Sequence, residues 1–187
     1  MTKNEICDNG GWVVSAVSSG GPLEVAKQTE AVLAMMDTMP EKFGCAGFNR
    51  EECRAFIHKA EEEIMKLPQA PLKNRHFFSH GVYARELVIP AGTVLTGEIH
   101  KDDCFNFVLS GKIMILTEET PLCTLTAPMV VKSGSNIKKL GYALEDTVFV
   151  TTHPCNTDNL ALIEKEIFTK TYTDEDTHIL PTMDFIF

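Results

Sequence analysis

The hydrophobic positions of the first part of the chain follow the period of an α-helix. Residues 22–38 contain no internal helix breaker, are rich in Ala, Glu, Leu and Met, and begin with Pro22, which fits a first helical turn. A second segment is introduced by Asn49 and Glu52 at the spacing of a capping box and is followed by Pro68. Its apolar positions recur at the helical period and form one stripe: Cys53, Phe56, Ile57, Ala60, Ile64 and Leu67. The pattern therefore predicts two helices, and the second must lay its stripe on another part of the protein.

From about Phe77 the pattern changes to short apolar runs separated by Gly, Asp and Pro, which indicates a small β-sandwich or barrel. A later amphipathic segment, Leu160–Phe168, predicts a third helix with Asp158 as its N-cap. The chain ends in an apolar tail over 183–187, which we expect to dock on its own fold or on a neighbouring subunit. The predicted strands are Val82–Ile89, Val94–His100, Phe105–Leu109, Lys112–Thr117, Leu122–Val131 and Thr147–Thr152.

The composition of the 187 residues is that of an ordinary globular protein, with 44% hydrophobic and 23% charged residues. No apolar run approaches the roughly 18–20 residues of a membrane span. The formal net charge of −9 argues against sequence-independent nucleic-acid binding, which uses Lys and Arg to neutralise phosphates. The first residues lack a signal-peptide pattern, so we expect a cytoplasmic protein whose partners include neither a membrane nor a nucleic acid.

Six cysteines, at positions 7, 45, 53, 104, 123 and 155, contain no Cys-x-x-Cys pair. This spacing argues against a zinc ribbon and against a thioredoxin-like redox site. Disulfides persist in oxidising compartments, so in a cytoplasmic protein we expect reduced thiols. Most of them are expected to be small buried hydrophobic side chains.

The stretch from Gly92 to Gly111 carries a resemblance to a known family. It reads Gly92, five residues, Glu98-Ile99-His100, three residues, Cys104, six residues and Gly111. This resembles the first motif of cupins, in which a glycine is followed by five residues, His-x-His, three or four residues, a glutamate, six residues and a glycine. The resemblance covers roughly residues 76–168 and implies a mainly β fold, a cupin-type jelly-roll (double-stranded β-helix) barrel. We expect an N-terminal helical extension over 1–70 packed against a barrel over 71–169, and a C-terminal tail over 170–187.

The metal ligands of the family are only partly retained. The first family His is replaced by Glu98, the second is kept as His100, and the family Glu falls on Cys104. In the second motif Ile137 stands in place of the His. The His₃Glu centre that the family implies is therefore absent from this sequence.

Strand parity indicates which side chains can take the place of those ligands. Glu98 and His100 share one strand face, and His153 lies on an alternating late strand. A barrel can bring Glu98, His100, Cys104 and His153 together, and carboxylate, imidazole and thiolate all bind zinc or iron. Two interpretations stay open, a variant divalent-metal site and a polar, hydrogen-bonded lining without metal.

Three further residues are candidates for ligand binding. Tyr83 and Arg85 share a face of one predicted strand, and Asn106 shares a face with Cys104. An inward Arg85 offers a bidentate grip on a carboxylate or phosphate, whereas the alternative is an arginine at the rim paired with an acid. A solvated strand edge is expected for three lysines, Lys132, Lys138 and Lys139.

The run from His76 to His100 and the segment 141–148 also resemble uncharacterised cupin-like proteins of tailed bacteriophages and prophages. This resemblance implies a phage gene product that acts in a bacterial host cytoplasm. It names no reaction.

Three functions stay open, in order of preference. The first is a binding protein that holds a polar or anionic small molecule. The second is a divalent-metal-dependent enzyme of isomerase, lyase or oxygenase type, which uses His100, His153 and Glu98 or Cys104. The third is a homo-oligomeric structural or interaction protein. The sequence identifies no cofactor, and zinc and iron are the candidates. We expect a homodimer or a higher homo-oligomer. The residues expected to contact a ligand are Tyr83, Arg85, Glu98, His100, Asn106 and His153.

Overall fold

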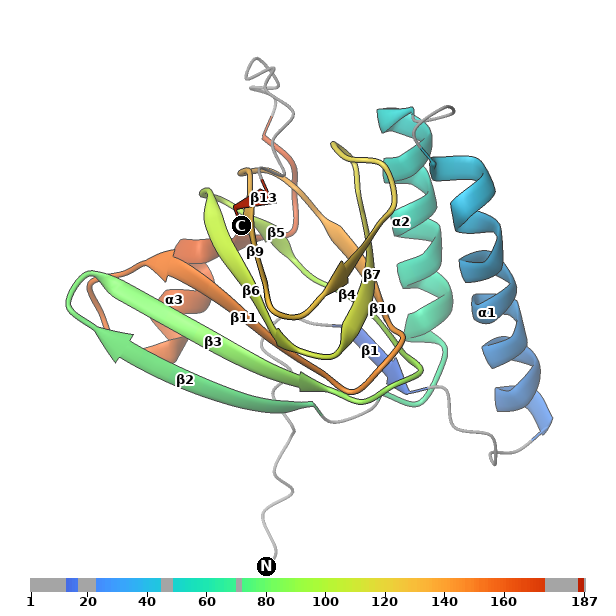
Figure 1. Cartoon of the computed structure of the whole chain (residues 1–187), viewed down its shortest axis with the longest axis horizontal. Helices are drawn as coiled ribbons and strands as arrows, with labels where there is room; N and C mark the ends of the chain where they lie inside the picture. Colours follow the sequence, from blue (N-terminus) through green and yellow to red (C-terminus); the bar gives the residue numbers. More distant parts are fainter. Residues whose placement is uncertain (1–12, 17–22, 45–48, 70–71, 174–184, 187) are drawn as a thin grey trace, which may run out of the picture.

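The computed structural model describes residues 13–16, 23–44, 49–69, 72–173 and 185–186, which form two packed antiparallel sheets with helices at their sides (Figure 1). The five-stranded sheet contains, in order, β1 (Val13–Ala16), β4 (Thr93–Thr96), β10 (Lys139–Ala143), β7 (Lys112–Thr117) and β8 (Cys123–Thr126). The six-stranded sheet contains β13 (Phe185–Ile186), β9 (Met129–Ser133), β6 (Cys104–Ser110), β11 (Thr147–Pro154), β3 (Val82–Ile89) and β2 (Lys73–Ser79). A separate short pair joins β12 (Phe168–Thr169) to β5 (Ile99–His100).

The strand order is that of a jelly roll. The order β4-β10-β7-β8 faces the order β9-β6-β11-β3, so that successive strands cross between the sheets as two interlocked Greek keys. The predicted mainly β jelly-roll fold is therefore confirmed. Between the sheets lies an apolar core to which β3, β4, β6, β7 and β11 all contribute: Leu87, Ile89, Leu95, Val108, Ile113, Ile115, Leu125, Val131, Ala143 and Phe149.

Two helices, α1 (Leu23–Phe43) and α2 (Arg50–Met65), lie side by side against the outer face of the five-stranded sheet (Figure 1). As predicted, Asn49 caps α2 by accepting a hydrogen bond from the backbone N–H of Glu52 at 3.1 Å. The predicted stripe is buried except for the partly exposed Phe56. A second apolar core joins this stripe to α1 and to the outward side chains of the sheet: Val32, Met36, Met39, Phe43, Val94, Leu116 and Leu140.

Several element boundaries differ from those predicted. Helix α1 runs on to Phe43, because Met39 and Phe43 are buried and continue its apolar side. The predicted strand 94–100 is divided at Gly97 and Glu98 into β4 and β5, and the predicted strand 122–131 is divided at Ala127 and Pro128 into β8 and β9. Five strands of the described residues were not predicted, namely β1, β2, β10 and the two-residue strands β12 and β13.

The C-terminal part of the chain returns to the barrel. Helix α3 (Leu160–Ile167) is capped by Asn159, one residue beyond the predicted Asp158, with the Asn159 side chain accepting from the N–H of Ala161 at 3.0 Å. Phe185 and Ile186 pair with β9, so this part of the tail docks on its own fold as expected. Residues 183, 184 and 187 of the tail lie outside the described residues. No helix of the described part of the chain has the length and apolar character needed to cross a membrane.

Candidate functional site

The interior of the barrel changes from apolar to polar toward one end. There the inward side chains of both sheets and of β5 form a buried set, which we call the polar layer: Tyr83, Arg85, His100, Cys104, Asn106, Ser133, Lys139, Thr151 and His153. Each of these residues is at most 4% exposed. A polar layer of this size inside a small barrel is unusual, because buried polar groups destabilise the fold unless they find partners.

Strand register explains how the six-stranded sheet builds most of this layer. Thr151 on β11 lies opposite Arg85 on β3 and opposite Asn106 on β6. His153 lies opposite Tyr83 in the same ladder. Because alternate residues of a strand point to the same face, these five side chains all enter the barrel. The structure thus shows that the face shared by Tyr83 and Arg85 and the face that carries Asn106 are the inward ones.

His100, Cys104 and His153 form the centre of the layer. The Nδ1 atom of His100 lies 3.2 Å from the Sγ atom of Cys104, and the two imidazole rings have centroids 5.0 Å apart. One potential ligand atom from each of the three residues lies within 4.8 Å of the others. The Sγ of Cys104 also approaches Oδ1 of Asn106 at 3.8 Å, within reach of a weak S–H···O hydrogen bond.

Glu98 is not part of this centre. The parity argument placed it beside His100, but Gly97 and Glu98 interrupt the strand between β4 and β5. Glu98 is partly exposed, and among the described residues it does not join the group formed by His100, Cys104 and His153. The alternation of side chains holds only within a continuous strand, which is why the prediction for Glu98 was wrong.

Two cations enter the layer from opposite sheets. Arg85 comes from β3 and is 1% exposed, while Lys139 comes from β10 and is 3% exposed. The expected solvated edge is thus wrong for Lys139. It is also wrong for Lys138, which directly precedes β10 and is buried with its Nζ 2.8 Å from Oε1 of Glu61. Lys132 is half-exposed and pairs with Asp103 at 2.8 Å. Lys139 is the functional candidate that sequence reasoning missed.

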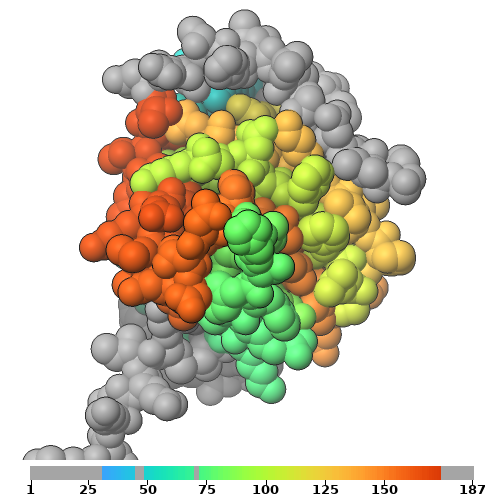
Figure 2. Space-filling view, turned by 90° about the vertical axis from the view of Figure 1, so that its left-hand side faces the viewer, coloured from blue at the N-terminus to red at the C-terminus, as the bar shows by residue number. Residues whose placement is uncertain are grey.

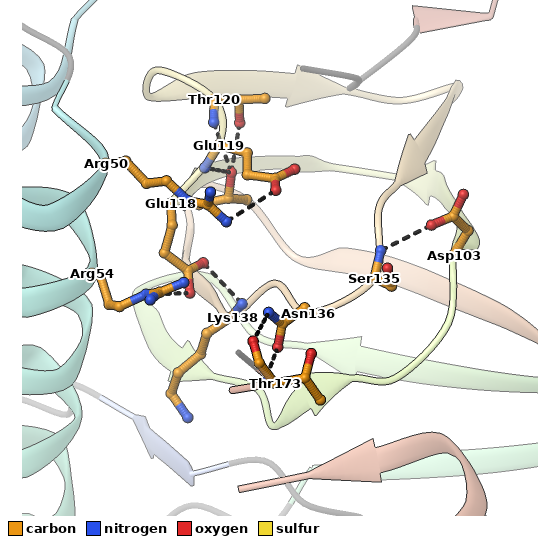
Figure 3. Close-up of polar contacts among 11 residues, drawn as sticks. Arg50, Arg54, Asp103, Glu118, Glu119, Thr120, Ser135, Asn136, Lys138 and Thr173 are labelled. Atoms are coloured by element: carbon orange, nitrogen blue, oxygen red, sulfur yellow. Dashed lines mark hydrogen bonds and ion pairs between the residues drawn. The ribbon is translucent and has the colours of Figure 1, made fainter. Parts of the chain in front are cut away.

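A second polar network holds the segment that leads into Lys139 (Figure 3). The carboxylate of Glu118, fully buried, accepts a hydrogen bond from the backbone N–H of Lys138 at 2.9 Å. Its other oxygen lies 3.7 Å from Nε of Arg54 on α2. A neighbouring pair joins Arg50 of α2 to Glu119 at 3.4 Å. Helix α2 therefore fixes the start of β10, and with it the position of Lys139.

The electrostatics of the layer keep its histidines neutral. Burial lowers the pKa of His100 well below its usual value, and the charges of Lys139, His153 and Arg85 add to the effect. Burial, with Arg85 and Lys139, lowers the pKa of His153 to about 3. Burial also raises the pKa of the Cys104 thiol, although Lys139 and Arg85 act against that rise. These mutual effects show that the ammonium of Lys139 lies close to both histidines and to the thiol.

Several polar atoms of the layer have no hydrogen-bond partner among the described residues. They are Nδ2 of Asn106, Oγ of Ser133, Nζ of Lys139, Oγ1 of Thr151 and both ring nitrogens of His153. Buried polar atoms in native proteins are nearly all satisfied, so a cluster of this kind indicates a place where a small molecule, an ion or ordered water binds.

The polar layer is closed by the segment that contains α3 and β12. The ring of Phe168 lies edge-on to His100 and to His153, with centroids 5.2 and 5.6 Å apart, and the guanidinium of Arg85 lies 4.5 Å from its centre. From α3, Glu164 reaches the guanidinium, with its Oε1 3.4 Å from Nη1 of Arg85. Figure 2 shows this end of the molecule, where the orange segment around α3 lies beside the green tip of the β2–β3 hairpin.

Two depressions open on the surface near this end. The larger, of about 630 Å³, lies between the β2–β3 turn and the loop from β11 to α3, and includes His80, Cys155 and Asp158 in its lining. The smaller, of about 270 Å³, includes Cys104 and His153 in its lining, together with Asp103, Phe105 and Lys132. The site thus lies directly beneath the surface at this end.

The predicted ligand-binding set is brought together except for Glu98. Tyr83, Arg85, His100, Asn106 and His153 all line the polar layer. For Arg85 the structure decides between the two interpretations, since the side chain is inside the barrel rather than at an exposed rim.

The described cysteines, Cys53, Cys104, Cys123 and Cys155, are free thiols as expected. Three of them are buried, and Cys123 is partly exposed. The predictions for Cys7 and Cys45 lie outside the described residues.

The residues present fit a divalent metal. Two neutral imidazoles and a thiol within 4.8 Å supply three ligands of the type that zinc and iron prefer. Neither ring nitrogen of His153 is engaged in a hydrogen bond within the described residues, so either can coordinate.

Comparison with known proteins finds only distant similarities to solved structures. No family model matches the chain, and no curated protein sequence matches it. Among solved structures, a cupin-like protein from Thermotoga maritima has 14% identity and a TM-score of 0.41, covering 46% of this chain and 70% of that chain. KdgF from Halomonas sp. has 14% identity and a TM-score of 0.41, covering 46% of this chain and 81% of that one.

An acetylacetone dioxygenase from Acinetobacter johnsonii has 18% identity and a TM-score of 0.38, covering 46% of this chain and 61% of that one. These similarities are distant, and the jelly-roll assignment rests on the strand order itself. The resemblance to phage-encoded proteins stays a prediction.

Proposed function

We propose that this chain is a cupin-type binding protein that holds a small anionic molecule in the polar layer of its barrel. The observation that carries the proposal is the pair Arg85 and Lys139, two cations buried to 1% and 3% exposure inside one barrel. Burying a charge is costly unless a partner compensates it. The residues of the layer itself include no carboxylate, and Glu164 reaches Arg85 from the partly exposed side of α3 at 3.4 Å. An anionic ligand inside the layer would interact with both cations at once.

The other side chains of the layer suit the same role. The guanidinium of Arg85 is shaped to bind a carboxylate or phosphate with two parallel hydrogen bonds, and Lys139 adds a point charge from the opposite sheet. The amide of Asn106 and the hydroxyl of Thr151 supply donors that have no partner among the described residues. Neutral His100 and His153 can donate or accept without adding to the positive charge.

A calorimetric titration tests this function. Small carboxylates and inorganic phosphate are titrated into the wild-type chain and into the Arg85→Gln and Lys139→Gln variants. Binding to the wild type that weakens at least tenfold in both variants supports the proposal, because a hydrogen-bonded charge is lost in each. Lys112→Gln is the control, since Lys112 lies on β7 outside the layer. Binding of equal strength in all four proteins contradicts it.

A metal-dependent function is the second candidate, and the close approach of His100, Cys104 and His153 favours it. A zinc or iron ion held by these three residues would supply Lewis-acid chemistry. The chain's own residues would orient the substrate: Arg85 and Lys139 would bind its anionic part, and Phe168 would exclude water from the layer. Metal analysis of protein purified without added metal tests it, with less than about a tenth of an equivalent counting against a tight three-ligand site.

A homo-oligomeric role and a cytoplasmic location stay predictions. The outer face of the six-stranded sheet presents Phe77, Phe105 and Leu109 at 43–55% exposure, which is the kind of apolar surface that subunits bury. Size-exclusion chromatography with light scattering tests the assembly, and a monomer would contradict it.

A further inference from the structure

Most of the polar layer is closed off from solvent in this structure, and the depression lined by Cys104 and His153 reaches only its edge. Arg85 is 1% exposed, and Asn106 is fully buried. A molecule larger than water therefore reaches Arg85 only when a covering segment moves.

The segment that contains α3 and β12 covers the layer and is joined to β5 by few backbone hydrogen bonds. Strand β12 pairs with β5 over only two residues, Phe168 with His100 and Thr169 with Ile99. One further backbone hydrogen bond runs from the N–H of Lys101 to the carbonyl of Ile167 at 2.8 Å. The apolar contacts of the segment form a small cluster separate from the two main cores: Tyr83, Cys155, Ile163, Ile167 and Phe168. Segments with few buried contacts open at low free energy, while the strands around them stay paired.

This segment also brings a carboxylate to the entrance of the layer. Oε1 of Glu164 lies 3.4 Å from Nη1 of Arg85, a distance longer than an optimal charged hydrogen bond. The Glu164 side chain is 30% exposed, whereas that of Arg85 is 1% exposed. This ion pair is partly exposed, so a ligand that binds Arg85 with two parallel hydrogen bonds can replace it.

We propose that Glu164 is an internal carboxylate that occupies Arg85 in the closed state, and that the ligand is a carboxylate compound that displaces it as α3 and β12 move aside. The inference rests on the proposed anion-binding function and adds the class of ligand and the control of access. Glu164 already shows that a carboxylate on a short carbon chain can reach the guanidinium from the entrance. The ring of Phe168, which contacts the Arg85 guanidinium and both histidines, leaves the layer with the same segment.

The first experiment removes the competing charge. Acetate, benzoate and inorganic phosphate are titrated into the wild type, Glu164→Gln and Glu166→Gln. Glu166 is an exposed carboxylate on the same helix and is the matched control. Glu164→Gln is expected to bind a carboxylate probe about fivefold more tightly than the wild type, as loss of a weak competing ion pair implies. Glu166→Gln is expected to bind like the wild type.

Unchanged or weaker binding by Glu164→Gln overturns the inference, and so does a gain for phosphate without a gain for either carboxylate. Other results would contradict the proposed function itself. These are binding by the wild type that does not depend on Arg85, and no binding of any probe by either the wild type or Glu164→Gln. The inference alone fails when the wild type binds a carboxylate through Arg85 but Glu164→Gln binds it no better.

The second experiment locks the segment. Ile99 and Thr169 are direct partners in the β5–β12 pair, at the spacing a disulfide can bridge, so the double variant Ile99→Cys/Thr169→Cys can be oxidised there. The oxidised variant is expected to lose binding of the carboxylate probe, and dithiothreitol is expected to restore it. Equal binding by the oxidised and reduced forms shows that the segment does not control access. The reduced form serves as the folding control.

Discussion

Nδ1 of His100 lies 3.2 Å from Sγ of Cys104, inside a barrel whose opposite sheet directs the ammonium of Lys139 toward the same thiol. This contact joins a short strand, β5, to the first residue of β6. It places a thiol and an imidazole where either a metal or the anionic group of a ligand can bind. The chemistry of the molecule therefore centres on a few residues at one end of the jelly roll.

The metal hypothesis predicts a spectroscopic signature of the thiolate. Addition of Co²⁺ to the purified chain should give the near-ultraviolet charge-transfer band of a cobalt–thiolate bond, because Cys104 lies with His100 and His153 in one group. Cys104→Ser should lose the band, and Cys123→Ser, which changes a thiol outside the group, should keep it. A band of equal strength in Cys104→Ser would remove Cys104 from the site.

Acid should destabilise the fold through the buried histidines. His153 has a pKa of about 3 in the folded chain and an ordinary value near 6.5 when unfolded, and His100 is shifted in the same direction. Between these values the unfolded chain binds more protons, so stability is fully present above about pH 6.5 and is lost as the pH falls toward 3. Each histidine contributes a slope of up to about 1.4 kcal/mol per pH unit in that window.

Urea unfolding at a series of pH values measures this slope. His153→Phe should reduce it, because the variant has one fewer group that takes up a proton on unfolding. A slope that is the same in His153→Phe and in the wild type would contradict the burial effect.

The buried charge of Lys139 should lower the free energy of unfolding of the ligand-free chain. Its Nζ is buried without a hydrogen-bond partner among the described residues, and burial lowers its pKa. Lys139→Met keeps most of the side-chain volume and removes the charge, so the free energy of unfolding without ligand should rise by about 1–3 kcal/mol. Chemical denaturation measures the change, and a destabilised Lys139→Met would show that the charge is already compensated within the chain.

Several strands and part of the site could be predicted from the sequence, because both follow from local alternation. Val82–Ile89 and Lys112–Thr117 coincide with β3 and β7. Parity grouped Arg85 with Tyr83 on one strand face, and the structure shows that this face is inside. Asn49 and Glu52 mark the start of α2 by a contact between near neighbours. Such patterns involve residues close together in the sequence, so they can be recognised without the tertiary structure.

What could not be predicted depends on neighbours far along the chain. Strand β10 shows no alternation of apolar and polar residues, because both of its faces are buried. Leu140 packs against α2 on one face, and the residues of the other face lie between the two sheets. Lys139 therefore reads as a surface lysine, and only the gap in strand spacing between Gly134 and Thr147 hinted at a strand there. Closure of the layer by Glu164 and Phe168 arises from contacts with β3 and β5, more than 60 residues earlier in the chain.

The central claim, that the polar layer binds a small anion, is tested most directly by a thermal-shift screen of the wild type and Arg85→Gln. The screen uses a panel of carboxylates, phosphate and phosphate esters at saturating concentration. At least one member should raise the Tm of the wild type by several degrees, as binding to the folded state requires, and should leave the Tm of Arg85→Gln unchanged. A panel that shifts neither protein, or shifts both by the same amount, would contradict the claim.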